Sequence, residues 1–186
     1  GREREFADLV GDAFSFQLPA DSGSVWILYG SATGITATGL RYLDQDSSDG
    51  GGVEMLNSCE VSDFFGQSLA AGDWNGDFAA DLAIGVASET LGTTNNAGAV
   101  QVVYGFPGVG LRVAGNQFWR ESNVATGGVE EAEDHFGLAL AAGDVTGDGI
   151  DDLVIGTPYE DVAGYTDAGA ITLLWGQPGT GLDTPG

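Results

Sequence analysis

The feature that most constrains this chain is an acidic loop, set between two apolar runs, that occurs twice. Residues 65–87 read FGQSLAAGDWNGDFAADLAIGVA, and residues 136–157 read FGLALAAGDVTGDGIDDLVIGT. The two copies begin 71 residues apart, and each places oxygen-bearing side chains at every second loop position. Repetition at a fixed spacing is typical of a protein built from similar structural units. We therefore expect an all-β chain whose repeated chemistry lies in a short loop between strands.

Both loops have the composition of a metal site. Positions 1, 3, 5, 7 and 9 are Asp73, Asn75, Asp77, Ala79 and Asp81 in the first copy, and Asp144, Thr146, Asp148, Ile150 and Asp152 in the second. Carboxylates this close repel one another by about 1–4 kcal/mol per pair, and neither loop contains Arg, Lys or His. Calcium binds about six to eight oxygens, including backbone carbonyls. We predict side-chain ligands at positions 1, 3, 5 and 9, with Thr146 acting directly or through water, and a carbonyl ligand at position 7.

Two other kinds of loop share part of this pattern. A helical EF-hand loop needs a bidentate Glu at position 12, where this chain has Ile84 and Ile155 within apolar runs. A solvated Asp/Gly turn is the simpler alternative for a single such stretch. Two copies with matching flanks favour two calcium sites on strands. Gly76, Gly147 and Gly149 supply the tight turn, because glycine accepts positive φ without a steric penalty.

The order of motifs resembles the FG-GAP repeat. In sequence these motifs are Phe-Gly, a small apolar strand, the acidic loop, Asp-Leu-x-Ile-Gly, and Gly-Ala followed by Tyr-Gly or Trp-Gly. That repeat is the blade unit of the integrin alpha-chain β-propeller and of many bacterial integrin-like surface proteins. The resemblance implies blades of four-stranded antiparallel sheets, with calcium in the hairpin between the first two strands. The chain departs from the pattern at Thr146 and at Phe78, which replaces a glycine, so we expect weaker binding in the first loop.

The resemblance divides the chain into three units. Residues 63–132 are expected to form a complete blade. Its predicted strands are 65–72, 82–87, 99–104 and 117–121, with turns at Asn95-Asn96 and Pro107-Gly108. Small residues in the first of these strands suit the position nearest a propeller axis. Phe118 and Trp119 on the fourth strand are predicted to pack between blades, with ligand binding as the alternative.

Residues 1–62 are expected to be the later part of a preceding blade. Asp8-Leu9-Val10-Gly11 corresponds to the strand that follows an acidic loop, but Arg4 occupies the place of Asp77, so no metal is predicted there. The runs 25–30, 100–105 and 171–176 are predicted as strands buried on both faces. The acidic tract of Asp44, Asp46 and Asp49 is predicted to be a flexible inter-blade loop, with a cation site as the alternative.

Residues 133–186 are expected to form a blade that lacks its outer strand. One complete and two incomplete blades cannot close a ring, and the open sheet edges would be exposed. We therefore expect the chain to be part of a larger propeller rather than one of several copies that complete a ring together.

Composition limits the classes of partner that this chain is expected to bind. The formal net charge is −23, with no Lys, which argues against binding to nucleic acid or to an anionic membrane. No apolar run is long enough to span a bilayer. Cys59 is the only cysteine, so no internal disulfide can form. An acidic, lysine-free surface fits a secreted or cell-surface protein in calcium-containing surroundings.

Reactive groups are scarce. His135 is the only histidine and is predicted to be a solvated loop residue near carboxylates. Glu130, Glu131, Glu133 and Asp134 read as a solvated charge run, and no Gly-x-Ser-x-Gly or phosphate-binding motif occurs. We therefore expect no enzymatic activity. The favoured function is a calcium-stabilised module that binds a protein or glycan through its loops. The alternative is a non-catalytic scaffold within a larger secreted hydrolase or polysaccharide lyase.

Overall fold

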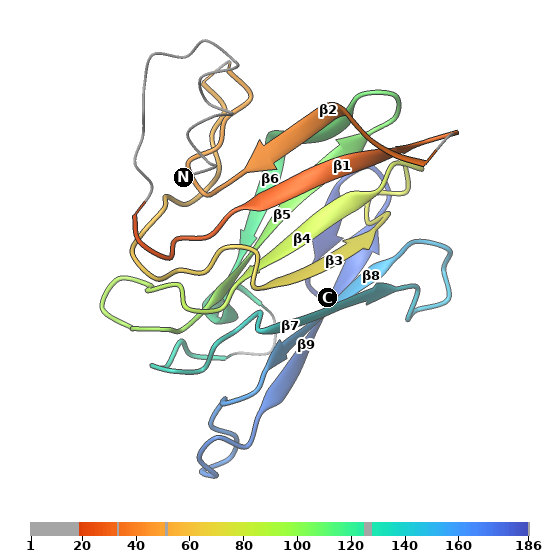
Figure 1. Ribbon diagram of the computed structural model, residues 1–186. Coiled ribbons are helices and arrows are strands. Elements are labelled where there is room, and N and C mark those ends of the chain that lie inside the picture. The colour runs from red at the N-terminus through yellow and green to blue at the C-terminus, as the bar shows by residue number, and fades with distance from the viewer. Residues whose placement is uncertain (1–18, 33, 51, 125–127, 186) are drawn as a thin grey trace.

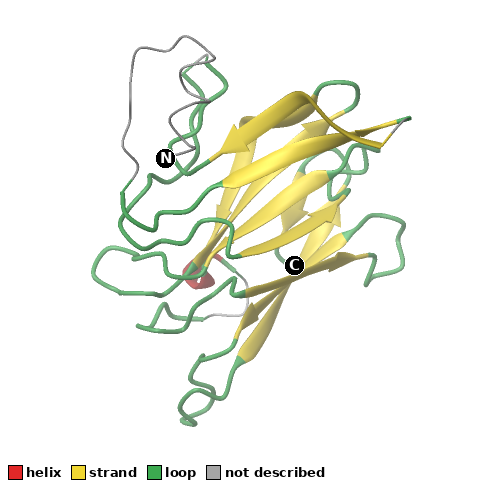
Figure 2. Cartoon of the chain, viewed as in Figure 1, coloured by secondary structure: helices red, strands yellow, loops and turns green. Residues whose placement is uncertain are grey.

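A computed structural model describes residues 19–32, 34–50, 52–124 and 128–185 (Figure 1). Within them almost every regular element is a β-strand, as Figure 2 shows by colour. The elements are β1 (Val25–Ser31), β2 (Gly34–Leu43), β3 (Ser68–Gly72), β4 (Asp81–Val86), β5 (Ala99–Phe106), β6 (Gly110–Trp119), the short 3-10 helix η1 (Glu121–Asn123), β7 (Ala139–Gly143), β8 (Asp152–Thr157), β9 (Ala170–Gln177) and β10 (Gly181–Asp183).

The strands form three antiparallel sheets in which chain neighbours pair. β1 pairs with β2, the middle sheet has the order β3-β4-β5-β6, and the last sheet has the order β7-β8-β9-β10. The last two sheets repeat the same register: Gly72 pairs with Asp81 at the base of the first acidic loop, and Gly143 pairs with Asp152 at the base of the second. This all-β arrangement of four-stranded sheets confirms the predicted propeller blades.

The three sheets stack face to face around two apolar layers. Val25, Leu43, Ile84 and Val103 belong to the layer between β1–β2 and the middle sheet. The layer between the middle and last sheets includes Val100, Val102, Leu153, Ile155 and Trp74. The innermost strands β3 and β7 contact each other, and their sequences SLAAG and ALAAG consist of small residues apart from one leucine each. Small side chains allow this close approach, as the sequence predicted.

A repeated joint connects each sheet to the next. Phe65 forms a parallel bridge with Gly23, and Phe136 forms the same bridge with Gly98. Gly98 has φ +85°, and a Cβ atom there would lie 2.3 Å from the Phe136 carbonyl oxygen. Any other residue would therefore both strain the backbone and clash. The Phe-Gly motif thus fixes the position at which each innermost strand begins, relative to the preceding blade.

The predicted fourth strands need two corrections. The strand predicted at 117–121 begins earlier, at Gly110, and ends at Trp119, because η1 follows at Glu121. The last blade does have the beginning of a fourth strand, β10, where none was expected. The Leu182 N–H donates to the Tyr104 hydroxyl at 2.9 Å, just as the Leu111 N–H donates to the Tyr29 hydroxyl at 3.3 Å. β10 therefore occupies the same place as the start of β6.

Burial on both faces was predicted for three runs and holds for one. β5 is buried from Ala99 to Gly105, but β1 and β9 alternate between buried and exposed residues. The reason is that β5 lies between two apolar layers, whereas β1 and β9 each contact one within the described residues. Trp119 packs against the second layer, in agreement with the prediction for that residue.

Two predictions concern the first unit. The run Asp8-Leu9-Val10-Gly11 and the substitution at Arg4 lie outside the described residues. The acidic tract is hydrogen-bonded throughout: Asp44 accepts from Ser47, Asp46 from the Cys59 N–H, and Asp49 from Arg41 and the Ala114 N–H. Its three carboxylates do not form a cation cluster among the described residues. No helix in the described part of the chain is long and apolar enough to cross a membrane.

Candidate metal centre

The first acidic loop is the hairpin between β3 and β4. Asp73 accepts hydrogen bonds from the Asp77 N–H at 3.1 Å and the Phe78 N–H at 2.9 Å. Asn75 Oδ1 also accepts from the Asp77 N–H, and Asp77 Oδ1 accepts from the Ala79 N–H. These side chains turn inward because backbone N–H groups point into the loop, with Gly76 at φ +71°. Positions 1, 3 and 5 therefore line one concave turn.

The second loop, between β7 and β8, repeats this pattern. Asp144 accepts from the N–H groups of Gly147, Asp148 and Gly149 at 2.6–3.0 Å. Asp148 accepts from the Ile150 N–H at 2.9 Å. Residues Asp144, Thr146 and Asp148 are exposed, so an ion could reach the loop directly from solvent.

Position 9 acts as the base of each loop. Asp81 is buried and accepts from the Trp74 N–H at 2.9 Å and from the Gly105 N–H at 2.8 Å. Asp152 is likewise buried and accepts from the N–H groups of Val145, Thr146 and Gly176. The carboxylate thus ties the loop to the end of the third strand of its own blade. Burial raises the pKa of Asp81 to about 6, against the opposing effect of its two backbone hydrogen bonds.

Position 8 behaves differently from its neighbours. The Asp151 side chain points away from its own loop and accepts from the Asp73 N–H at 3.0 Å, while the Asp151 N–H donates to the Asp73 carbonyl at 3.2 Å. The first loop is therefore held from outside by a residue of the second. Position 8 is not part of the predicted ligand set, and the Asp151 side chain bonds to the neighbouring loop.

The residues of both loops fit a hard divalent cation. All the donors are oxygens. A carboxylate oxygen has two lone pairs, and each Asp73 oxygen and Asp144 Oδ2 accepts one backbone hydrogen bond, which leaves a lone pair for a cation, whereas Asp144 Oδ1 already accepts two. The loop carboxylates are not drawn into a tight group, however. Among the described residues, three carboxyl oxygens approach within 4.8 Å of one another at two other places and not in the loops. The predicted ligand set thus lies on one turn of each hairpin, held open by backbone hydrogen bonds.

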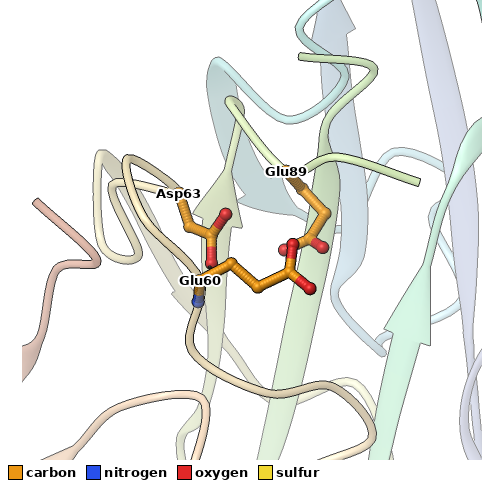
Figure 3. A group of neighbouring side chains, drawn as sticks. All are labelled: Glu60, Asp63 and Glu89. Carbon is orange, nitrogen blue, oxygen red and sulfur yellow. Dashed lines mark hydrogen bonds between the residues drawn. The ribbon is translucent and has the colours of Figure 1, made fainter. Parts of the chain in front are cut away.

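The two tight carboxyl groups both lie at the ends of the sheets that are away from the hairpin loops. Glu60, Asp63 and Glu89 form the first, and Figure 3 shows these three side chains pointing toward one another from two loops. Glu121, Asp134 and Glu160 form the second. Burial raises the pKa of Asp63 to about 6, of Glu89 to about 7 and of Glu121 to about 8, the last also through the charges of Glu160 and Asp134.

Sequence reasoning missed both groups. Asp134 was assigned to a solvated charge run but is buried, and its carboxylate accepts from the Glu131 N–H at 2.7 Å. The signal was present, because Asp63 and Asp134, like Glu89 and Glu160, are 71 residues apart. His135 is near Glu133, as predicted, but is not simply solvated: Nδ1 lies 2.8 Å from the Ala87 carbonyl oxygen.

Comparisons with known proteins agree with this geometry. The FG-GAP repeat model matches residues 65–103 and 136–174, which are the two units containing the acidic loops. Phosphatidylinositol-glycan-specific phospholipase D of Rattus norvegicus is 31% identical over 173 residues, covering 92% of this chain and 19% of the relative. Integrin alpha-5 of Xenopus laevis is 30% identical over 97% of this chain and 15% of the relative. Integrin alpha-PS2 of Drosophila melanogaster is 32% identical over 63% and 8%.

The chain spans about a fifth or less of the length of these relatives. The family model and the relatives nevertheless point to the same repeat, and the two matched segments begin at the Phe-Gly motifs Phe65 and Phe136. The resemblance read from the sequence is thereby confirmed: the chain carries two FG-GAP repeats, at residues 65–103 and 136–174.

Proposed function

We propose that this chain is a calcium-stabilised β-propeller module that serves binding rather than catalysis. The observation that carries the proposal is the repeated hairpin loop whose inward-facing donors are all oxygens and whose position 9 is buried. The first site would use Asp73, Asn75, Asp77, Asp81 and the Ala79 carbonyl. The second would use Asp144, Thr146, Asp148, Asp152 and the Ile150 carbonyl. Calcium would neutralise carboxylates that otherwise repel one another.

The ion's role in this proposal is structural. In each loop the base residue already connects the hairpin to the end of the third strand, through Gly105 or Gly176. Balancing the charge of positions 1 and 5 would stiffen the hairpin above that base. A rigid loop surface loses less conformational entropy when it binds a partner. The partner in this proposal is an extracellular protein or glycan, in keeping with the integrin alpha chains among the relatives.

Calorimetric titration of metal-free protein tests the loop sites. We expect Asp73→Ala combined with Asp144→Ala to remove two calcium ions from the wild-type stoichiometry, with little binding of magnesium to either protein. Asp183→Ala, which changes an exposed aspartate outside the loops, is the matched control and should leave the stoichiometry unchanged. An unchanged stoichiometry in the double variant would refute the loop assignment.

The binding role has its own test. Immobilised protein should retain a glycan or an extracellular-matrix protein from a defined panel in calcium and release it in chelator. Retention that does not depend on calcium would argue against the proposed link between the loops and recognition. The rest of the propeller in the parent chain is expected to take part in the surface, so the assay should include the longest parent chain that can be produced.

One relative favours a second candidate. The similarity to a phospholipase D covers 92% of this chain, so the module could serve as a non-catalytic scaffold of a larger secreted enzyme. Both versions place catalysis outside this chain. We expect no hydrolysis of bis(p-nitrophenyl) phosphate by the purified protein with or without calcium, and calcium-dependent turnover by it would overturn both.

A further inference from the structure

The two tight carboxyl groups occupy equivalent places in successive blades, and we name them by that position. The first joint set is Glu60, Asp63 and Glu89, and the second joint set is Glu121, Asp134 and Glu160. Each set combines an aspartate just before the innermost strand of a blade with a glutamate just after its second strand. Strand direction places both residues at the end of the sheet away from the hairpin loops.

A side chain from the preceding blade completes each set. Val25 pairs with Leu43 on β2, and Val100 pairs with Trp119 on β6. Gln45 lies two residues after Leu43, and Glu121 lies two residues after Trp119. The first joint therefore has an amide where the second has a carboxylate. The Gln45 Nε2 donates to Glu89 Oε2 at 2.8 Å. Three segments from two blades therefore meet at each joint.

Gln45 supplies an independent sign of a missing ligand. Its residue exposure is 1%, yet its Oε1 has no hydrogen-bond partner. A buried polar atom left unpaired costs about 1–3 kcal/mol. The amide N–H of Gln45 faces Glu89, and rotation about the terminal amide bond would put the oxygen in its place, exchanging that hydrogen bond for a bond to a cation. At the second joint, Glu121 is 4% exposed, and its Oε2 is also without a partner.

Among the described residues no ion pair reaches the joint sets, because Arg120, which lines the cleft beside the first set, pairs with Glu130. The ion pairs found in the described residues involve the carboxylates of Asp49, Glu130 and Glu133, and none of the six joint carboxylates. In each set one carboxyl oxygen from every member lies within 4.8 Å of the other two, so a single hard divalent cation could contact all three. Calcium accepts about six to eight oxygens in a flexible geometry, whereas magnesium needs a near-ideal octahedron, so an irregular set of carboxylates suits calcium better.

The first joint set is also reachable. A cleft of about 520 Å³ is lined by Glu60 and Glu89 together with Asn57, Phe118 and Arg120. The exposed Glu60 stands on this side of the set, and Asp63 is buried behind it. An ion entering from the cleft would thus meet a flexible ligand first and fixed ligands second.

We propose that each joint set binds a calcium ion that clamps one blade to the next, at the opposite end from the hairpin loops. These would be a second class of site, distinct from the loop sites. The ligands are the three carboxylates of each set, with the Gln45 oxygen as a fourth at the first joint. The clamp explains why buried carboxylates recur at the same place in two blades without a basic partner.

Titration of loop-deleted protein tests the clamp separately from the loop sites. In Asp73→Ala/Asp144→Ala protein we expect about two calcium ions to remain bound, one at each joint set. Adding Glu89→Gln and Glu160→Gln should remove them, whereas adding Glu54→Gln, an exposed glutamate outside both sets, should not. Circular dichroism checks the fold of each variant. If folded loop-deleted protein binds no calcium, the clamp is wrong and protons balance the joint carboxylates.

Wild-type loops provide the second arm, in case the loop-deleted protein does not fold. Gln45→Glu gives the first joint the residue found at the second, and should raise the calcium affinity of that site about tenfold, or about 1.4 kcal/mol. Glu121→Gln should weaken the second joint correspondingly. If Gln45→Glu lowers the melting temperature in chelator and calcium does not restore it, the clamp is refuted. Failure of the loop assignment is distinguishable from failure of the clamp, because it would appear as an unchanged calcium stoichiometry in Asp73→Ala/Asp144→Ala protein.

Discussion

The two hairpin loops have the same ligand pattern but different surroundings. The first loop lies against the last sheet, where Trp74 is 0% exposed, and the N–H groups of Gln177 and Gly179 donate to the carbonyls of Trp74 and Asn75 at 3.0 and 2.7 Å. In the second loop, Val145 stands at the position of Trp74 and is 61% exposed. The ligands of a loop thus come from its own hairpin, whereas its rigidity comes from the neighbouring blade.

The comparison implies different dependence on calcium. A loop that is already held by packing and by Asp151 gains little order from an ion. In the second loop only the end of the turn, at Asp151 and Asp152, bonds to the first loop, and its exposed ligand positions have no packing like that of Trp74, so an ion should order it more. The following predictions test this difference, beginning with the largest effect.

Trp74→Ala should have the largest effect, lowering the free energy of unfolding by about 3–5 kcal/mol. The change empties a fully buried site and removes the hydrogen bond from Trp74 Nε1 to the Asp152 carbonyl. Val145→Ala, at the equivalent position, should change stability by about 0.5 kcal/mol or less. Urea unfolding of both variants in chelator gives the two values. Similar losses would mean that the loops are supported alike.

Asp151→Ala should cost about 1.5–3 kcal/mol, the typical value for a hydrogen bond to a charged group. Because Asp151 braces the Asp73 N–H from outside the ligand set, the loss should be the same with and without calcium. Asp148→Ala should instead lower chiefly the increase in melting temperature that calcium produces, with a smaller loss in chelator from its hydrogen bond to the Ile150 N–H. Calorimetric melting of both variants in calcium and in chelator distinguishes these outcomes. Equal effects of calcium in the two variants would contradict the assigned register.

The stability of metal-free protein should fall as pH rises from about 5 to about 8. The pKa values of Glu89 and Glu121 are raised to about 7 and about 8 in the folded protein, from about 4.5. The folded state therefore binds more protons than the unfolded state in this window, and stability declines as those protons leave. Melting temperatures in chelator should show the decline. Glu89→Gln/Glu121→Gln should flatten it, and a rise with pH would contradict the assignment.

The sequence predicted what each repeat contains but not what lies between repeats. Strand order, the acidic loops and the small residues of β3 and β7 follow from local patterns that recur along the chain. The joint sets combine residues such as Gln45 and Glu89, which are 44 positions apart, and no local pattern brings them together. Similar apolar runs predicted burial on both faces for β1, β5 and β9, but only β5 has an apolar layer on each side among the described residues, and the run itself does not specify its neighbouring sheets.

The smallest effect should come from Phe78, where the first loop departs from the second. Phe78 has φ +67°, at the place where Gly149 has φ +92°. A left-handed conformation costs a non-glycine residue about 1–2 kcal/mol, and the added chain entropy of glycine offsets about 0.5–1 kcal/mol of the relief. The ring is 96% exposed, so no buried contact is lost. Phe78→Gly should therefore raise the free energy of unfolding by up to about 1 kcal/mol.

The same variant decides where the strain is felt. In this structure Phe78 holds its strained φ together with the hydrogen bonds that shape the loop, such as the Phe78 N–H to Asp73. The strain therefore belongs to the folded state and not to the binding step. Phe78→Gly should leave the calcium affinity of the first loop nearly unchanged, while Gly149→Ala destabilises the second loop. A markedly tighter first loop in calorimetric titration would show instead that Phe78 weakens calcium binding there, as the departure from the repeat pattern first suggested.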